Sequence, residues 1–400
     1  MTERLQIEIG EWIVGAALAG SDDIAILAGV CERLEGAEIP LARVSISGDL
    51  LDPTFDGRGV RWKRGLGAGE EVFARVNDTA VSADWKRSPF FHLIETREVR
   101  LRRRLDASYR RGEFPLLDTL QDQGATDYAA FGATIGEGTR LGDIRGVISS
   151  WTTDRPGGFT DAHIELLAGI MPTLALAFIL RTINRAARTM VTTYLGSDAA
   201  LRVLAGNIVR GRAERIRAVV WYSDLVGFTR ISETVSPDGV LALLNDYAEA
   251  QVESIEAHGG HVLKFIGDGI LAIFPDDNPV RACAQALDAA ESQRDRIAAL
   301  RDRRAAAGLP VTDVRLALHI GELLYGNVGS PRRLDFTVLG PAVNEAARIE
   351  ALCGSLDQSV IVSTAFADAA GEARSRLVSL GRYAMKGVAR PQELFTLDPS

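Results

Sequence analysis

From about residue 217 onward the sequence alternates strand-like and helix-like segments, and this alternation restricts the fold more than any other feature. Residues 218–223 are nearly all apolar, as in a strand buried on both faces of a sheet. Ser236 and Pro237 suit the cap and the first residue of a helix, which Gly259 and Gly260 would end. The pattern continues with strands at 261–267, 270–274, 314–320 and 335–339 and helices at 279–307 and 341–352. These segments predict an α+β domain.

The first 180 residues predict a separate domain of strands and helices. The expected elements are a helix over 5–34, strands over 41–47, 128–135 and 144–152, a Gly157-Gly158 turn and a helix from about Asp161. The end of this region reads GGFTDAHIELLAGIMPTLALAF and resembles the C-terminal half of a GAF domain, a small α/β sensor module. The resemblance implies a regulatory domain that could receive an unknown small ligand.

An arginine-rich stretch in this first region allows two interpretations. It could receive an anionic ligand, or it could be a solvated face of a helix, which is the commoner meaning of such a run. The stretch contains Arg97, Arg100, Arg102, Arg103, Arg104, Arg110 and Arg111.

Residues 181–214 are predicted to connect the two domains through a helix. Apolar residues spaced three and four apart form the seam expected of a short two-stranded coiled coil, namely Leu180, Ile183, Ala187, Met190 and Tyr194. Gly196, Gly206 and Gly211 break the pattern beyond it. The alternative is a single helix packed on its own domain. We favour a dimer contact, because the catalytic interpretation given below requires a dimer.

Charge and composition argue against several classes of protein. The net charge of −8 does not suit a general nucleic-acid binder, which needs a basic surface. The three cysteines are isolated and are read as buried apolar side chains rather than zinc ligands; they are Cys31, Cys283 and Cys353. The most apolar run, 166–180, contains Pro172 and is shorter than the about 20 residues that cross a bilayer. With no signal-peptide pattern at the start, we expect a cytoplasmic protein without a membrane span.

Two aspartates are predicted to form a metal site. Asp224 ends the apolar strand, where a carboxylate serves no packing purpose, and Asp268 lies at a hairpin tip signalled by Asp268-Gly269. If the two strands are neighbours, both carboxylates meet at one sheet edge and suit a divalent cation. The turn Gly227-Phe228-Thr229 opens the next helix, so its free N–H groups can receive phosphate oxygens. For Asp268 alone, ordinary turn chemistry is the competing interpretation.

Other polar side chains lie on predicted elements without an obvious packing role. Strand alternation places Lys264 and Asp268 on one face, and a lysine on an otherwise apolar strand needs a partner. Asn344 and Arg348 are four apart on a helix and share a face, where they could bind a sugar and a phosphate or simply meet solvent. Lys386 lies in a predicted loop and is uninformative by itself.

Five segments, in order, resemble the successive motifs of class III adenylate cyclases. They are YSDLVGFT, KFIGDGILAIF, LALHIGELLYGNVGS, DFTVLGPAVNEAARIE and YAMKGVARPQELF, and together they span about 215–397. The resemblance implies a catalytic domain over 215–400 with a ferredoxin-like βαββαβ core. Before it come the GAF-like domain over 1–180 and the helical connector over 181–214.

The resemblance also implies roles at matching positions. Asp224 and Asp268 match the metal-binding aspartates, which would hold two Mg²⁺ or Mn²⁺ ions per active site. Asn344 and Arg348 match the pair that stabilises the transition state. Basic residues expected at the triphosphate are Lys386 and Arg315.

Purine choice is expected to rest on Lys264 and Thr337, which match the two purine-selecting positions. The threonine stands where mammalian transmembrane cyclases carry Asp, and it is similar to a bacterial subgroup that uses ATP. A lysine can donate to N1 of adenine but opposes the N1–H of guanine. These residues therefore favour ATP as the substrate.

The predicted function is conversion of ATP to 3′,5′-cyclic AMP and pyrophosphate, regulated by the first domain. The enzyme is expected to be a homodimer with its active sites at the subunit interface. Guanylate cyclase is one alternative, which Lys264 disfavours. A catalytically silent sensor or scaffold is another, which the complete set of polar site residues argues against. A diguanylate cyclase would need a Gly-Gly-Asp/Glu-Glu-Phe motif, but residues 266–269 read IGDG.

Overall fold

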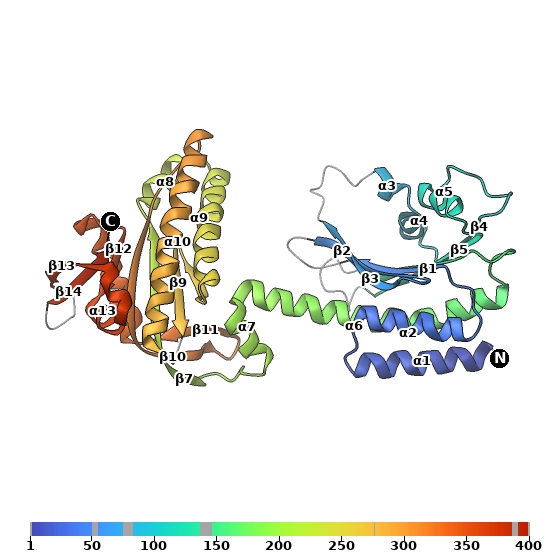
Figure 1. Ribbon diagram of the computed structural model, residues 1–400, viewed down its shortest axis with the longest axis horizontal. Coiled ribbons are helices and arrows are strands. Elements are labelled where there is room, and N and C mark those ends of the chain that lie inside the picture. Colours follow the sequence, from blue (N-terminus) through green and yellow to red (C-terminus); the bar gives the residue numbers. More distant parts are fainter. Residues whose placement is uncertain are drawn as a thin grey trace. The chain divides into compact units, whose positions relative to one another are not determined.

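The computed structural model describes residues 2–49, 55–74, 83–136, 146–275, 277–385 and 391–398. The chain divides into two compact units, unit 1 (Met1–Met190) and unit 2 (Val191–Ser400) (Figure 1). Each unit combines helices with one β-sheet.

Unit 1 is built on a six-stranded antiparallel sheet in the order β3-β2-β1-β6-β5-β4. The strands are β1 (Arg43–Asp49), β2 (Phe55–Lys63), β3 (Gly67–Ala74), β4 (Arg100–Arg104), β5 (Asp127–Thr134) and β6 (Gly146–Thr153). The helices are α1 (Thr2–Leu18), α2 (Asp23–Gly36), α3 (Ala83–Lys86), α4 (Pro89–Thr96), α5 (Pro115–Asp122) and α6 (Asp161–Leu195). The strands predicted in this region correspond to β1, β5 and β6, and the helix predicted from about Asp161 is α6.

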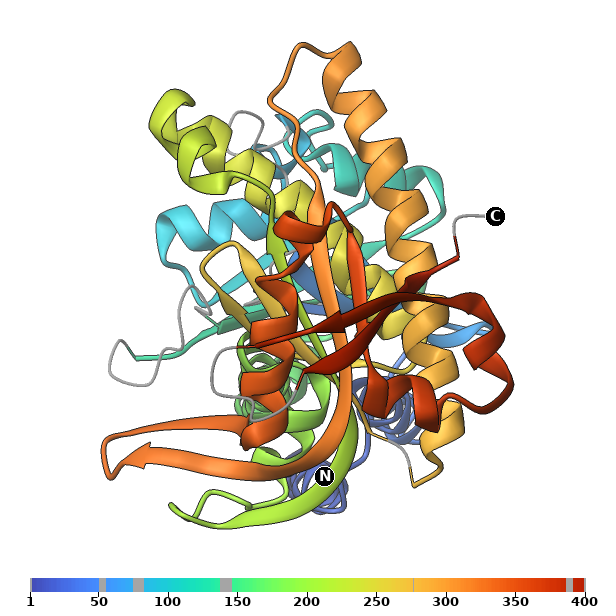
Figure 2. The same cartoon turned by 90° about the vertical axis from the view of Figure 1, so that its left-hand side faces the viewer.

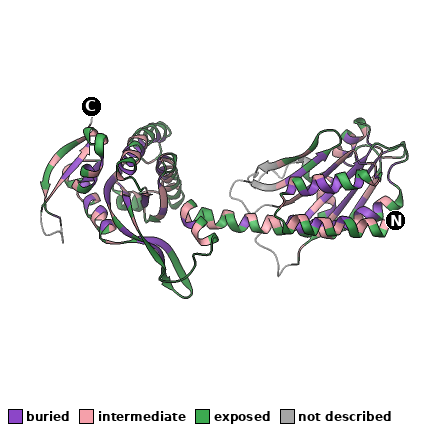
Figure 3. Ribbon diagram, turned by 60° about the horizontal axis from the view of Figure 1, so that its bottom comes forward, coloured by how far each residue is buried: buried purple, intermediate pink, exposed green. Residues whose placement is uncertain are grey.

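Helices lie on both faces of this sheet. On one face, α1, α2 and α6 bury the main apolar core together with strand residues such as Val44 and Trp151. On the other face, α4 and α5 cover the β4–β5 end with a smaller cluster around Leu117 and Tyr128. Figure 3 shows buried residues along the strands and on one side of the helices. Because neighbouring residues of a strand point to opposite faces, β5 and β6 contribute to both clusters.

The helix predicted over 5–34 is in fact two helices. α1 ends at Leu18, and Gly20 beyond it adopts a left-handed conformation with a φ of 82°. Asp22 then caps α2, and its carboxylate accepts a hydrogen bond from the Ala25 N–H at 2.7 Å. The turn between the two helices lets both of them pack into the same apolar core.

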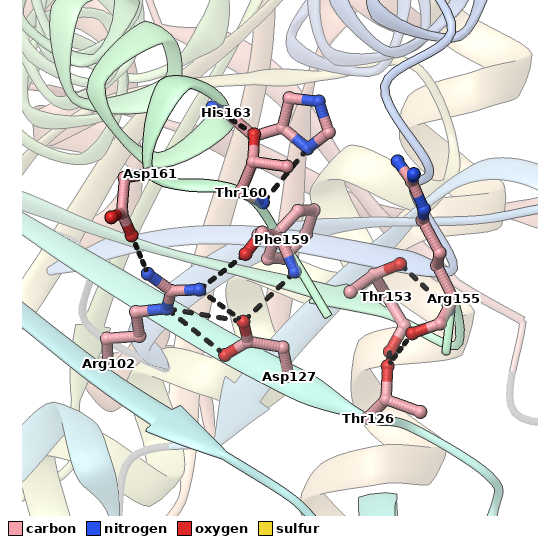
Figure 4. Close-up of polar contacts among 9 residues, drawn as sticks. All are labelled: Arg102, Thr126, Asp127, Thr153, Arg155, Phe159, Thr160, Asp161 and His163. Atoms are coloured by element: carbon pink, nitrogen blue, oxygen red, sulfur yellow. Dashed lines mark hydrogen bonds and ion pairs between the residues drawn. The ribbon is translucent and has the colours of Figure 1, made fainter. Parts of the chain in front are cut away.

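Four arginines of the arginine-rich stretch lie on strand β4 and the others lie outside any helix, so the interpretation as a helix face is wrong. Arg102 donates to the buried carboxylate of Asp127, with a shortest contact of 2.8 Å, and to Asp161 at 2.9 Å (Figure 4). Asp127 also accepts from the Phe159 N–H at 3.0 Å, so the network ties β4 and β5 to the start of α6. Other arginines of the stretch pair with Glu165, Glu113 and Asp122. Much of this positive charge is therefore already neutralised by internal acids.

α6 is 35 residues long and, within the described ranges, the one helix long and apolar enough to cross a membrane. The core helix of a globular protein meets the same criteria, and half of its most apolar window is buried inside the chain. Pro172 lies within the helix without ending it. Of the predicted seam, Ile183 packs against the core of unit 1, whereas Met190 and Tyr194 are exposed.

Unit 2 is built on an eight-stranded sheet in the order β13-β14-β12-β10-β7-β9-β8, with β11 paired to β10 outside this path. The strands are β7 (Ala213–Leu225), β8 (His261–Ile266), β9 (Gly269–Pro275), β10 (Val314–Ser330), β11 (Arg333–Leu339), β12 (Val360–Ser363), β13 (Leu377–Tyr383) and β14 (Gln392–Leu397). The helices are α7 (Ser197–Leu204), α8 (Phe228–Thr234), α9 (Pro237–Ala257), α10 (Pro279–Ala306), α11 (Pro341–Glu350), α12 (Cys353–Leu356), α13 (Thr364–Ala369) and a 3₁₀ helix (Gly371–Arg376).

Four of these strands and two long helices form the predicted βαββαβ arrangement. The chain order is β7, α9, β8, β9, α10 and β10, and the strands lie in the sheet as β8-β9-β7-β10 with antiparallel neighbours. Ser236 caps α9 as predicted, because its side chain accepts from the Gly239 N–H. β10 runs beyond its predicted end at residue 320 to Ser330, because its second half pairs with β11. β7, β10 and β11 extend past the rest of the sheet (Figure 2).

The two faces of the unit 2 sheet carry different helices. α10 packs on the face that contains Trp221 and Phe274, and α11 packs on the face that contains Val220 and Leu271. Asp224 is four residues after Val220 on β7, so it lies on the α11 face.

Candidate active site

Two carboxylates meet at the end of β7, as predicted. β7 pairs with β9 as far as Ser223 and Ile270, so Asp224 lies beside the turn that joins β8 to β9. That turn consists of Gly267 and Asp268, one residue earlier than the predicted pair. The Asp268 side chain lies within hydrogen-bonding reach of the Asp224 carboxyl group.

Glycine is required where the β8–β9 turn meets β7. A Cβ atom at Gly269 would lie 2.3 Å from the Ser223 carbonyl oxygen and 3.2 Å from Asp224 Oδ1. A side chain at this position would push the turn, and Asp268 with it, away from Asp224. Gly267 adopts a φ of 62°, which residues with a Cβ atom rarely adopt. Both glycines therefore help to bring the carboxylates together.

The carboxyl groups at this site repel one another. Burial, the neighbouring Asp268 and the negative charge of Glu350 raise the pKa of Asp224 to about 6. Burial also raises the pKa of Glu350, an effect that Arg315 opposes and Asp268 reinforces. Within the described residues no three His, Cys, Asp or Glu side chains form a metal cluster. A cation bound by Asp224 and Asp268 would relieve their repulsion, and carboxylate oxygens suit Mg²⁺ or Mn²⁺.

Arg315 lies on the same face as the carboxylate pair. It is directly opposite Asp224 in the register of β7 and β10. Its guanidinium group packs against Gly354, where a Cβ atom would lie 2.7 Å from Nη2. The fold thus places the positive charge of Arg315 near Glu350, and opposite Asp224 in the strand register.

Lys264 forms an ion pair that the sequence analysis did not predict. Its Nζ atom donates to Asp335 Oδ2 at 2.7 Å, and both side chains are partly exposed. Thr337 is two residues further along β11, on the same side of the strand as Asp335. It is buried, and its Oγ1 atom has no hydrogen-bond partner in the described part of the chain. The two predicted purine-selecting residues therefore lie close to one carboxylate.

The expected relation between Lys264 and Asp268 is wrong. Asp268 belongs to the turn rather than to strand β8, so strand alternation does not place it on a face with Lys264. The register of β8 and β9 also shifts between Val262 and Lys264. Lys264 contacts β11, whereas Asp268 lies beside β7.

Asn344 and Arg348 lie on α11, which begins at Pro341, and both are exposed. Neither side chain forms a hydrogen bond or an ion pair with any residue that the structure describes. Their four-residue spacing places them on one face of the helix, as predicted. An amide and a guanidinium group are therefore free to meet a ligand.

The remaining predicted residues are the Gly227-Phe228-Thr229 segment and Lys386. Gly227 adopts a φ of 66° and precedes the first residue of α8, so Gly227-Phe228-Thr229 opens a helix as expected. α8 is short, and the Arg230 N–H already bonds back to the Gly227 carbonyl oxygen at 3.1 Å. Lys386 lies outside the described residues.

Two residues of the site were missed by the sequence analysis. Asp335 had a usable signal, because it is two residues before Thr337 on a predicted strand and therefore shares its face. Glu350 had none, since a helical residue two positions after Arg348 points in another direction. Its place near Asp268 follows only from the packing of α11 on the sheet.

The sequence of unit 2 is similar to that of a known protein family. Residues 212–398 match the adenylate and guanylate cyclase catalytic domain. Unit 2 thus contains a cyclase domain. All the predicted site residues lie within the matched range. Because the family includes adenylate and guanylate cyclases, the match establishes a cyclase catalytic domain. It does not distinguish ATP from GTP as the substrate.

Two curated relatives match about half of this chain or less. An adenylate cyclase of Anabaena cylindrica is 35% identical over 161 residues, which cover 39% of this chain and 31% of that protein. Adenylate cyclase 1 of Rhizobium meliloti is 30% identical over 224 residues, which cover 52% of this chain and 33% of that protein. The chain therefore spans about a third of the length of these relatives. Among solved structures, the adenylyl cyclase CyaB from P. aeruginosa is 25% identical, covers 47% of this chain and 97% of that one, and has a TM-score of 0.43.

Proposed function

We propose that this chain is an adenylate cyclase that converts ATP to 3′,5′-cyclic AMP and pyrophosphate. The observation that carries the proposal is the close approach of Asp224 and Asp268 at the end of β7 in a cyclase domain. Two mutually repelling carboxylates suit divalent cations, which are also the natural partners of a triphosphate. The nearby guanidinium group of Arg315 adds a further positive charge for that substrate.

Each polar residue of the site has a distinct role in this proposal. Asp224 and Asp268 would hold Mg²⁺ or Mn²⁺, which would supply Lewis-acid chemistry at the ribose 3′-hydroxyl and positive charge for the leaving pyrophosphate. Arg348 stabilises the charge that builds on the α-phosphoryl group. Asn344 orients the ribose for in-line attack. The groups proposed to hold the triphosphate are Arg315, Lys386 and the N–H groups of Gly227, Phe228 and Thr229.

Purine choice is proposed to rest on Lys264, Asp335 and Thr337. The ammonium group of Lys264 donates to N1 of adenine, and an oxygen of Asp335 or Thr337 accepts from the N6 amino group. The unpartnered Thr337 Oγ1 atom supports direct contact with the base, because a buried hydroxyl without a partner is unfavourable.

The ion pair between Lys264 and Asp335 also supports a second candidate, guanylate cyclase. A lysine matches O6 of guanine, and a carboxylate matches its N1–H. The pair thus presents one donor and one acceptor, which each purine could use in a different orientation. Lys264 at the adenine N1 position is the reason for placing ATP first.

We propose that two copies of the chain share each active site. Asn344 and Arg348 are exposed on α11 and have no partner within the described residues. In a head-to-tail pair, the carboxylates of one copy face the α11 residues and the purine-selecting residues of the other. A two-fold axis then produces two equivalent sites.

An assay of the purified full chain with ATP and GTP, each with Mg²⁺ and with Mn²⁺, tests the proposed reaction. We expect cyclic AMP as the main product, with a kcat/KM for ATP at least about tenfold above that for GTP. Asp224→Asn serves as the inactive control. Cyclic GMP as the main product would select the second candidate, and neither product from a folded dimer would mean a silent sensor or scaffold.

We also propose that unit 1 regulates the cyclase domain. α6 contributes to the apolar core of unit 1 and continues to Leu195, directly before α7. Residues 1–400 and 191–400 should both form cyclic AMP, at different rates. Equal rates under all ligand conditions tested would contradict regulation. A folded, dimeric but inactive 191–400 fragment would mean that unit 1 contributes to the catalytic site.

A further inference from the structure

One face of the unit 1 sheet is polar at its centre. Arg43 of β1 pairs with Thr152 of β6, which pairs in turn with Tyr128 of β5, so these three side chains share a face. Ser45 and Ser150, one row further along the same strands, point to the same side. The main apolar core lies on the opposite face. Polar side chains at the middle of a sheet need partners of their own.

Three of these side chains have buried polar atoms without partners. Arg43 Nη1, Tyr128 Oη and Ser150 Oγ form no hydrogen bond with any described residue. Tyr128 and Ser150 are 0% and 1% exposed, so water does not satisfy their hydroxyl groups from the surface. Thr152, which lies between Arg43 and Tyr128 in the sheet, is different, because its hydroxyl group donates to the Arg43 carbonyl oxygen at 3.0 Å. The unpartnered atoms are therefore a local feature and not a property of the whole face.

The positive charge of this cluster, on Arg43, is not part of an ion pair with any described acid. Burial and the charge of Arg61 lower the pKa of Arg43, while Tyr128 and Glu71 act in the opposite direction. Glu71 forms its ion pair with Arg61, not with Arg43. In the part of the chain that the structure describes, Arg43 has no ion-pair partner. A largely buried guanidinium group without an anion is unfavourable.

We propose that this cluster is a binding site for a small oxyanion, such as a carboxylate or phosphate group. Arg43 and Tyr128 flank one intervening strand, so their backbones are about 10 Å apart, a distance that their two long side chains can span. Arg43, Tyr128 and Ser150 lie on the same face of three neighbouring strands, within one row of one another, so their side chains can reach a common point. A guanidinium N–H and two hydroxyl groups can each donate a hydrogen bond to a ligand rich in acceptors. This site is independent of the proposed cyclase reaction.

Hydrogen–deuterium exchange and thermal unfolding of the full chain test this site. Sodium phosphate and sodium acetate are titrated separately into a chloride buffer at constant ionic strength. At least one of them should give saturable protection of the segments that contain β1, β5 and β6. Arg43→Gln should weaken that apparent affinity about tenfold or more, since a charge-assisted hydrogen bond is lost. Arg111→Gln is the matched control, because Arg111 is exposed, pairs with Asp122 and should leave the affinity unchanged.

Tyr128→Phe separates ligand binding from packing. Without an anion this variant should unfold at the same temperature as the wild type or higher, because it removes a buried hydroxyl that lacks a partner. With the anion it should lose most of the protection. A clear loss of stability in the absence of anion would overturn the proposal. So would equal protection in wild type, Arg43→Gln and Tyr128→Phe, or no saturable protection by either anion.

Discussion

The carboxyl group of Asp268 lies within hydrogen-bonding reach of that of Asp224, although one ends a buried strand and the other lies in a hairpin turn. Burial, this contact and the charge of Glu350 raise the pKa of Asp224 to about 6. The fold therefore holds these groups against their mutual repulsion. A bound cation would attract both carboxylates and so offset their mutual repulsion. Its binding should therefore affect both activity and stability.

Asp224→Asn should abolish cyclic AMP formation and yet stabilise the cation-free protein. The substitution keeps the shape of the side chain and removes the charge that Asp268 and Glu350 oppose. After allowance for solvent screening we expect about 1 kcal/mol, which raises the melting temperature by about 2–4 °C. Mn²⁺ should stabilise the wild type and leave the variant nearly unaffected. A variant with a lower melting temperature in chelator, or with normal turnover, would contradict this.

The affinity for Mn²⁺ should fall as the pH drops below about 6. Because the folded-state pKa of Asp224 is raised, the cation-free folded protein binds more protons than the unfolded chain between the ordinary value of 3.8 and about 6. The contribution of Asp224 to the stability of the cation-free protein is therefore present at low pH and is lost as the pH rises through about 6. A bound cation needs the ionised form. Calorimetric titration should show a dissociation constant for Mn²⁺ that is constant above this pH and increases about tenfold per pH unit below it. A dissociation constant that does not change with pH would argue against Asp224 as a ligand.

Exchange of the charges of Lys264 and Asp335 should change the preferred purine. Lys264→Glu alone places two carboxylates against each other and should lose most activity with either nucleotide. Lys264→Glu combined with Asp335→Lys restores an ion pair but inverts its donor and acceptor. We expect the ratio of kcat/KM for ATP over GTP to fall at least about tenfold in the double variant. An unchanged ratio in an active, folded double variant would remove this pair from the purine pocket.

Asp127→Asn should strongly destabilise unit 1. Asp127 is fully buried and receives hydrogen bonds from Arg102 and from the Phe159 N–H (Figure 4). Removal of one member of a buried ion pair typically costs about 3–5 kcal/mol. Asp122→Asn is the matched control, since the exposed pair of Asp122 with Arg111 should contribute at most about 1 kcal/mol. Equal effects of the two substitutions on thermal unfolding would contradict the role given to this network.

Local signals were sufficient for much of unit 2. Ser236 with Pro237 correctly predicts the start of α9, and the apolar run after residue 217 correctly predicts a buried strand. The hairpin turn was predicted one residue late, because Gly-Asp and Asp-Gly are both good turn sequences. Its position depends on a long-range contact, namely the close approach of Gly269 to the Ser223 carbonyl oxygen.

Long-range pairing also explains the predictions that failed or were missing. The arginines of β4 read as a helix face because their partners, such as Asp127 and Glu165, are distant in sequence. Asp335 was overlooked because the extended β10 and β11 bring it to Lys264, and β10 was expected to end ten residues earlier. Periodicity identifies elements and faces, whereas ion pairs between distant elements become visible only in the folded chain.

Restoration of activity by two inactive variants tests the shared active site most directly. Asp224→Ala and Arg348→Ala should each be inactive, since loss of a charge-stabilising donor alone costs about 10²–10³ in rate. In a mixed dimer, one site collects both defects and the other collects none. With random exchange about half of the dimers are mixed, so cyclic AMP formation should recover to roughly a quarter of the wild-type rate. No recovery, with subunit exchange verified by a tagged pull-down, would mean that each site is built within one chain.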